Sequence, residues 1–231
     1  MTSALFQDFN ERSKEVSKYF VFMKTLEQGT TKLCIEGIGG RNKIRKLEPE
    51  LEKTLKASGF LLLYNLVEST MRNAIEAIFE ELRSKEVSFD QVRPELKAVV
   101  LKNIQRRNPD KVILKITAIS LDIITAGFEK EELFSGNIDG KLIRETGSKY
   151  GFSCSTNYAK TGDGHDLLTV KSNRNDLAHG IKSFAEVGRD QSMDDLLKIK
   201  KKVVKYLRQI LENIETYLAN KEYLDSFLST P

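Results

Sequence analysis

The sequence predicts an all-α protein, a helical bundle with additional helical hairpins. Three observations favour this fold class. Of the 231 residues, 40% are hydrophobic and 30% are charged, as in globular proteins that bury a core. The chain has only 4 prolines and 14 glycines, few for the many tight turns of a β-sandwich. Apolar residues recur every three, four or seven positions over long stretches, which indicates helices with one buried face.

The N-terminal third predicts two long helices joined by a connection. Apolar residues at helical spacing indicate a first helix over about residues 3–28. Residues 30–45 contain three glycines and predict a mobile or partly extended connection. From Pro49, a good first-turn residue, the longest helical pattern runs to about residue 83, with a bend near Ser58-Gly59. We expect this second helix to be central.

One run in the connection resembles phosphate-binding loops: Gly37-Ile38-Gly39-Gly40-Arg41-Asn42-Lys43. A dinucleotide fingerprint requires a third glycine where this chain has Asn42. A P-loop requires Ser or Thr after its lysine, and here Ile44 follows Lys43. We therefore interpret the run as a plain loop and expect no cofactor.

A helical hairpin is predicted next. Ser88 with Gln91 three positions later resembles a capping box and opens a helix to about Arg107. Pro109-Asp110 begins a further helix to about residue 126, although its isoleucines also suit a strand.

Two shorter helices and two loops follow. A turn at Ser135-Gly136-Asn137 precedes a helix over about Asp139–Tyr150, and residues 154–164 form a polar loop. Asp163 is expected to cap a helix over His165–Ala178, which Gly180 ends.

A second loop over residues 181–191 leads to the last helix. Ser192, followed by Asp195, caps this helix, and its apolar stripe extends to Tyr217. We expect a single domain over residues 1–231. Its core covers about 49–83 and 135–220, and its accessory helices cover about 3–28 and 88–126.

Charge and cysteine content exclude few classes of function. The chain has 37 Lys and Arg against 33 Asp and Glu, a balance compatible with nucleic acid but not diagnostic of it. Cys34 and Cys154 lie far apart and suggest reduced thiols in the cytoplasm. The first fourteen residues lack a signal pattern, and the longest apolar run is only Phe60–Tyr64, so we expect no membrane association. We also expect no metal, because no ligand motif occurs.

An arginine interrupts the apolar stripe of the helix over His165–Ala178. At about 100° per residue, Arg174 falls within the sector that holds the apolar side chains Leu167, Val170, Leu177 and Ala178. A buried guanidinium requires a carboxylate, a phosphate or water beside it. Lys171, Asn175 and His179 follow at four-residue steps and form a neighbouring polar row.

The central helix offers a partner for this row. Asn65, Glu68, Arg72 and Glu76 lie along one side of it. We expect the Glu68 carboxylate to bind Arg174 or Lys171, with Asn65 as the next candidate. Two plain interpretations stay open. A Glu68–Arg174 pair suits a purely structural helix contact, and His179 before Gly180 suits a histidine that binds the free carbonyls of a helix end.

The string Lys171-Ser172-Asn173-Arg174-Asn175-Asp176-Leu177-Ala178-His179-Gly180 resembles the signature of the HEPN superfamily. That signature is an Arg, a polar residue and a His four to six residues after the Arg, which Arg174, Asn175 and His179 match. The segments 60–69, 135–152 and 183–189 are also similar to the prokaryotic HEPN nuclease branch. The resemblance thus covers about residues 55–83 and 135–220.

The resemblance implies a HEPN-type helical bundle and a metal-independent endoribonuclease with a toxin or phage-defence role. Its partners would be RNA, a second copy in a homodimer, and an antitoxin or another defence-system protein. Catalysis would fall to Arg174, Asn175 and His179, with Glu68, Asn65 and Lys171 in support. Five positions separate Arg174 from His179, about 140° around a helix, so the helix end or a second subunit must bring them together.

Two other classes of function stay open. The first is a catalytically silent HEPN-like module that binds RNA or nucleotide, or only dimerises. The second is a structural helical adaptor. Basic runs at 198–208 and 93–115 suit either an RNA backbone or a solvated helix face.

Overall fold

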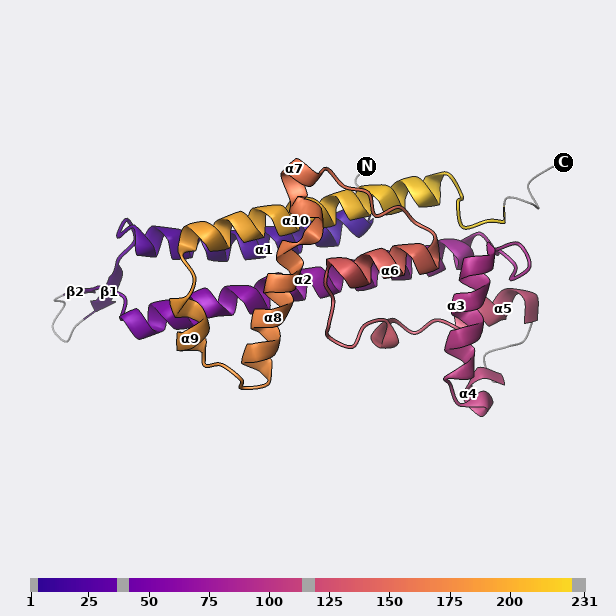
Figure 1. Cartoon of the computed structure of the whole chain (residues 1–231), viewed down its shortest axis with the longest axis horizontal. Coiled ribbons are helices and arrows are strands. Elements are labelled where there is room, and N and C mark those ends of the chain that lie inside the picture. Colours follow the sequence, from indigo (N-terminus) through magenta and orange to yellow (C-terminus); the bar gives the residue numbers. More distant parts are fainter. Residues whose placement is uncertain (1–3, 37–41, 114–118, 226–231) are drawn as a thin grey trace.

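Three long helices run side by side and give the molecule its elongated shape (Figure 1). The computed structural model describes residues 4–36, 42–113 and 119–225. The long helices are α1 (Ala4–Glu27), α2 (Pro49–Ser84) and α10 (Met193–Ala219), and each packs against the other two. The all-α fold class predicted from helical periodicity is confirmed.

Helix α1 belongs to this bundle, although an accessory helix was expected over about residues 3–28. Its apolar face is buried against α2 and α10, with Phe9, Phe20 and Met23 each only 1% exposed. The expectation is wrong because the periodic pattern shows that one face of α1 is buried but does not show which helices cover it. The core therefore includes the N-terminal helix.

Helix α2 is one uninterrupted helix of 36 residues that starts at Pro49, as predicted. At the site of the expected bend, Gly59 leaves room for an aromatic ring of α1. A Cβ at this position would lie 3.1 Å from Cζ of Phe20. Gly59 thus serves the packing of α1 on α2.

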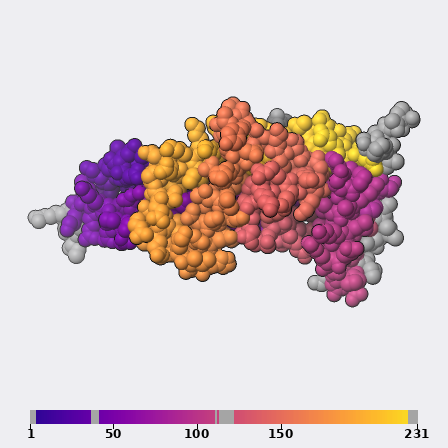
Figure 2. Space-filling model, in the orientation of Figure 1, coloured from indigo at the N-terminus to yellow at the C-terminus, as the bar shows by residue number. Residues whose placement is uncertain are grey.

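Shorter elements cover the bundle between its ends (Figure 1). Helix α8 (Asp166–Ala178) crosses α2, and α9 (Phe184–Arg189) packs against the first half of α2. Helix α6 (Gly140–Tyr150) has the predicted bounds within a residue, with Asp139 as its cap. Figure 2 shows α6, α8 and α9 on one face of the molecule, in coral and orange.

The two ends of the molecule carry the remaining elements. At one end lies an antiparallel hairpin of β1 (Leu33–Glu36) and β2 (Asn42–Arg45). The run Gly37–Arg41 lies outside the described residues. At the other end lie α3 (Pro94–Gln105), α4 (Pro109–Ile113), α5 (Ile119–Ala126) and η1 (Lys130–Glu132).

Both predicted loops of the C-terminal half contain helices. Residues 181–191 include α9, which a capping box of Ser183 and Glu186 begins. Residues 154–164 include α7 (Tyr158–Thr161) and η2 (Gly162–Gly164). These helices have only three to six residues, too few to display a helical period in the sequence.

Two predicted caps differ from the structure and one is confirmed. The Ser88 backbone N–H donates to the Gln91 side chain, but α3 begins only at Pro94. Asp163 does not cap α8, because it has a φ of +51° in the preceding turn. Ser192 accepts from the Asp195 N–H at 3.1 Å and begins α10 as expected.

Among the described helices, none combines the length and the apolar character that crossing a bilayer requires.

Candidate functional site

Helix α8 positions the predicted catalytic row. It ends at Ala178, with His179 as its C-cap and Gly180 in a left-handed conformation at a φ of +66°. The Ile181 N–H donates to the Asp176 carbonyl at 2.8 Å and closes the turn. Gly180 is the residue that permits this turn, so the helix stop predicted at Gly180 is confirmed.

Arg174 lies in the packed interface between α8 and α2, where its guanidinium covers an aromatic ring. Its Cζ atom lies 4.4 Å from the ring centroid of Tyr64, a buried residue of α2. Its Nη1 donates to the carbonyl of Gly136 at 3.1 Å and to Oδ1 of Asn175 at 2.9 Å. A cation–π contact and two hydrogen bonds thus fix the orientation of the guanidinium.

The segment Phe134–Asp139, which we call the bracket, holds the polar row of α8 in place. Asn175 donates from Nδ2 to Oδ1 of Asn137 at 2.8 Å, and Lys171 forms an ion pair with Asp139. The Ile138 N–H donates to the Tyr64 hydroxyl at 3.1 Å. The bracket therefore contacts both helices that carry the candidate site.

A glycine is required at the point where the bracket meets the arginine. Gly136 has a φ of +79°, and a Cβ there would lie 3.2 Å from Nη2 of Arg174. Any other residue would be strained in this conformation and would crowd the guanidinium.

The predicted pairing of Glu68 is wrong. Its carboxylate binds Arg72, one turn later on α2, at 2.7 Å, and does not reach Arg174 or Lys171. Arg72 also donates to the carbonyls of Lys130, Glu131 and Phe134, and so attaches η1 and the start of the bracket to α2. Tyr64 takes the place expected for Glu68, because stacking on a ring compensates a guanidinium without a second charge.

The structure joins only part of the predicted set. Arg174, Asn175 and Lys171 are linked through the bracket, whereas Asn65 is exposed on α2 and has no hydrogen bond to any of them. His179 is also exposed, and within one chain its imidazole makes no hydrogen bond to the described residues. Within one chain, the structure thus shows no hydrogen bond that joins His179 to Arg174 or Asn175.

The electrostatics of the bracket favour a charged Asp139. Burial raises the pKa of its carboxyl, but the hydrogen bonds from Lys171 and from the Leu142 N–H outweigh burial and leave the pKa lowered. The charged carboxylate therefore keeps Lys171 in place and caps α6 at the same time.

The contacts of Tyr64, Asn137 and Asp139 with this site were not predicted from the sequence, and Arg72 was predicted only as a member of the polar row on the central helix. Glu68 and Arg72 lie four residues apart, a spacing at which a Glu and an Arg form an ion pair on one helix. This ion pair could therefore have been predicted from the sequence. No sequence signal indicates that Tyr64 and Asp139 meet α8, because those contacts depend on how distant elements pack.

The arrangement can bind an anion next to α8. Of the donors of Arg174, only Nη1 is used within the described residues, so Nε and Nη2 have no acceptor there. These two nitrogens form the edge that binds a phosphate through parallel hydrogen bonds. Within the described residues, no group of three or more His, Cys, Asp or Glu side chains is placed to hold a metal ion.

The basic run on α10 is partly structural. Lys198 and Lys202 form ion pairs with Asp195 and Asp166, and Arg208 binds Asn10. Because these side chains already have partners, this part of the basic run is better explained as a solvated helix face than as a surface that binds an RNA backbone.

Comparison with known proteins gives a family. The family described as HEPN_MAE_28990-like HEPN matches residues 1–223. No curated protein and no solved structure matches the chain. Since the match covers nearly the whole chain, including α1, α2, the bracket and α8, this protein belongs to the HEPN_MAE_28990-like HEPN family.

Proposed function

We propose that the protein is an endoribonuclease that cleaves RNA by attack of the 2′-hydroxyl on the adjacent phosphate. Two copies of the chain would form one site, and protein side chains alone would supply the chemistry. The observation that carries this proposal is Arg174, held by Tyr64, Gly136 and Asn175 with its Nε and Nη2 edge left for a phosphate.

The reaction needs three functions that these side chains can supply. A base must take the proton of the 2′-hydroxyl, an acid must protonate the leaving 5′-oxygen, and a cation must stabilise the negative charge on the phosphorus oxygens. An imidazole exchanges protons near neutral pH, which suits His179. Arg174 would bind the scissile phosphate. Asn175 would hold the Arg174 guanidinium by accepting its hydrogen bond, and it would hold the bracket by donating to Asn137.

A second copy would complete the site. Within one chain, His179 makes no hydrogen bond to Arg174, and it is exposed at the end of α8. If two α8 helices pack antiparallel and overlap through their C-terminal halves, the C-terminal end of each lies beside the middle of the other. Leu168 and Ile181, near the two ends of α8, are 48% and 69% exposed and would supply apolar contact area.

The decisive experiment examines the products. Purified protein in EDTA is incubated with a defined RNA and with DNA of the same sequence. We expect RNA fragments that end in a 2′,3′-cyclic phosphate and a 5′-hydroxyl, and intact DNA, because only RNA carries the attacking oxygen. Cleavage of DNA, or RNA fragments with 5′-phosphates, would exclude this mechanism.

A catalytically silent RNA-binding module is the second candidate. It is favoured by His179, whose imidazole has no partner among the described residues that would orient it. RNA binding without any cyclic-phosphate product, at protein concentrations where the dimer is formed, would support this candidate over the nuclease.

The cellular role that we propose is that of a toxin or phage-defence nuclease restrained by a partner protein. This part rests on the family alone. Induced expression should arrest growth, and expression of the His179→Ala variant should not. Equal arrest by both proteins would contradict the role.

A further inference from the structure

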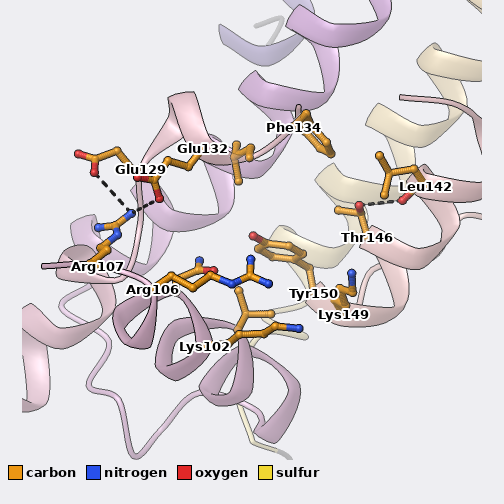
Figure 3. Close-up of a pocket in the computed structure, with 13 residues that line it drawn as sticks. Lys102, Arg106, Arg107, Glu129, Glu132, Phe134, Leu142, Thr146, Lys149 and Tyr150 are labelled. Carbon is orange, nitrogen blue, oxygen red and sulfur yellow. Dashed lines mark hydrogen bonds and ion pairs between the residues drawn. The ribbon is translucent and has the colours of Figure 1, made fainter. Parts of the chain in front are cut away.

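A cleft outside the candidate site lies between α3 and α6 (Figure 3). The residues that follow α5, from Glu129 to Phe134, close its third side. Neither Arg174 nor His179 lines it. The cleft therefore requires its own explanation.

The cleft gathers cations that lack acidic partners. Lys102, Arg106 and Lys149 line it, and none of the three forms an ion pair with a described residue. Figure 3 shows the ends of these side chains around the ring of Tyr150. Cations grouped without counterions repel one another, and a bound anion would relieve that repulsion.

The two carboxylates at the cleft share one arginine and are only partly neutralised, whereas the lining as a whole carries four cations against these two carboxylates. Glu129 and Glu132 each lie 3.6 Å from Nη2 of Arg107, which is turned away from the other cations (Figure 3). The side chain of Arg107 is 9% exposed, and its Nε has no hydrogen-bond partner among the described residues. The net charge facing a ligand is thus positive.

The cleft also has an apolar wall, which lies on the same elements that carry the cations. This apolar wall consists of side chains from α3, α6, the bracket and the residue before the bracket, namely Val99, Leu133, Phe134, Leu142 and Tyr150. The polar groups beside this wall are engaged, since Asn103 donates to the Gly127 carbonyl and Thr146 to the Leu142 carbonyl. Such a wall suits a flat, weakly polar ring and not a second charged group.

We propose that this cleft binds a nucleoside diphosphate. The diphosphate would contact Lys102, Arg106 and Lys149, and the base would lie against the apolar wall. Three cations match the charge of a diphosphate, and α3, α6 and the closing segment bound the cleft on three sides, which suits a short ligand better than a continuous strand.

The proposed ligand would contact the same segment that holds Arg174. Phe134 lines the cleft, its carbonyl accepts from Arg72, and Gly136 two residues later accepts from Arg174. Binding in the cleft does not depend on RNA cleavage, so it can be measured on a protein that cleaves nothing.

The test is calorimetric titration of the full-length protein, in EDTA, with ADP, GDP, CDP and UDP. Adenosine and pyrophosphate serve as the two halves of the ligand. We expect at least one diphosphate to bind at least about tenfold more tightly than either half, because it makes both the ionic and the apolar contacts. Absence of binding at millimolar concentrations would overturn the proposal.

A charge-removing variant tests the location. The triple variant Lys102→Gln, Arg106→Gln and Lys149→Gln should lose at least about tenfold in affinity, since it removes all three charge-assisted contacts. Its melting temperature should not fall, because these cations have no acidic partner among the described residues. The matched control is the triple variant Lys14→Gln, Arg83→Gln and Lys160→Gln, on exposed positions outside the cleft whose cations form no ion pair with a described residue.

Three further results would overturn the assignment. The first is an equal loss of affinity in the control variant. The second is pyrophosphate that binds as tightly as the best diphosphate, which would leave no function for the apolar wall. The third is an RNA oligomer that loses affinity in the cleft variant while no diphosphate binds, which would assign the cleft to the RNA backbone.

Discussion

The guanidinium of Arg174 lies over the ring of Tyr64, with its carbon 4.4 Å from the ring centroid. The same tyrosine accepts a hydrogen bond from the Ile138 N–H through its hydroxyl. One residue of α2 thus supports the candidate phosphate-binding group with its ring and the bracket with its oxygen. These two contacts can be separated by substitution.

Tyr64→Phe and Tyr64→Leu should therefore have different effects. Tyr64→Phe keeps the ring under Arg174 but leaves the buried Ile138 N–H without an acceptor, so unfolding free energy should fall by about 1–2 kcal/mol while RNA affinity changes little. Tyr64→Leu also removes the stacked ring, and RNA affinity should fall by about threefold to tenfold. Urea unfolding and filter binding measure the two effects. Equal RNA affinity in both variants would show that the ring does not position Arg174.

Arg72 should matter for stability more than for RNA binding. It binds Glu68 and three backbone carbonyls, so Arg72→Gln leaves several partly buried acceptors unpaired. We expect the free energy of unfolding to fall by about 3 kcal/mol. Arg72→Lys should recover little of this lost free energy of unfolding, since an ammonium lacks the planar, forked donors with which a guanidinium binds several acceptors at once.

A double-mutant cycle tests the partner of Glu68. Glu68→Gln and Arg72→Gln should couple by about 1 kcal/mol in unfolding free energy, and Glu68→Gln and Arg174→Gln should add without coupling. Stronger coupling of Glu68 to Arg174 would restore the pairing expected from the sequence.

The positions of the longer helices in the sequence can be predicted from periodicity and end signals. Which helices pack against one another cannot be predicted in this way. Pro49, Gly180 and Ser192 mark helix ends that the structure confirms, because each acts within one turn of its own position. The placement of α1 within the bundle could not be predicted in this way. It depends on Phe20 meeting Gly59, two residues on different helices.

In the candidate site too, features local to one helix could be predicted from the sequence, whereas contacts between distant segments could not. The row of Lys171, Asn175 and His179 is local to α8 and appears in the sequence as a four-residue step. The partners of that row are Asp139 and Asn137, which lie more than thirty residues earlier in the chain. Charge alone favoured Glu68 as the partner of Arg174, but an arginine four residues away on the same helix competes for that carboxylate.

The ion pair of Asp139 with Lys171 predicts a pH-dependent stability. The lowered pKa of Asp139 means that its contribution is complete above the pKa of the unfolded chain, near 4, and is lost as pH falls through the folded pKa. Asp139→Asn, which still caps α6, should be less stable than the unsubstituted protein by about 1–2 kcal/mol at pH 7. The difference should shrink below about pH 4 as the carboxyl protonates.

Urea unfolding at pH 7 and at pH 3 measures this difference. Lys171→Met serves as the control, because it removes the ion pair and leaves Asp139 as the cap of α6. A difference between the unsubstituted protein and Asp139→Asn that stays constant from pH 7 to pH 3 would show that the carboxylate charge does not contribute.

The composite site predicts that two inactive proteins restore activity when mixed. Arg174→Ala should weaken both RNA binding and cleavage, and His179→Ala should reduce cleavage by about 10²–10⁴-fold. His179→Ala should leave the melting temperature unchanged, since His179 is exposed. In a mixed dimer, the intact Arg174 of one copy faces the intact His179 of the other.

Equal amounts of the two variants, unfolded together and refolded, should cleave RNA faster than either variant alone and more slowly than the unsubstituted protein. Half of the dimers are mixed, and each mixed dimer keeps one intact pair of two. If each chain carried a complete site, every chain in the mixture would lack one of its two groups and activity would stay at the level of the single variants. Mixing His179→Ala with the double variant Arg174→Ala and His179→Ala is the matched control and should restore nothing, because no copy then supplies the histidine.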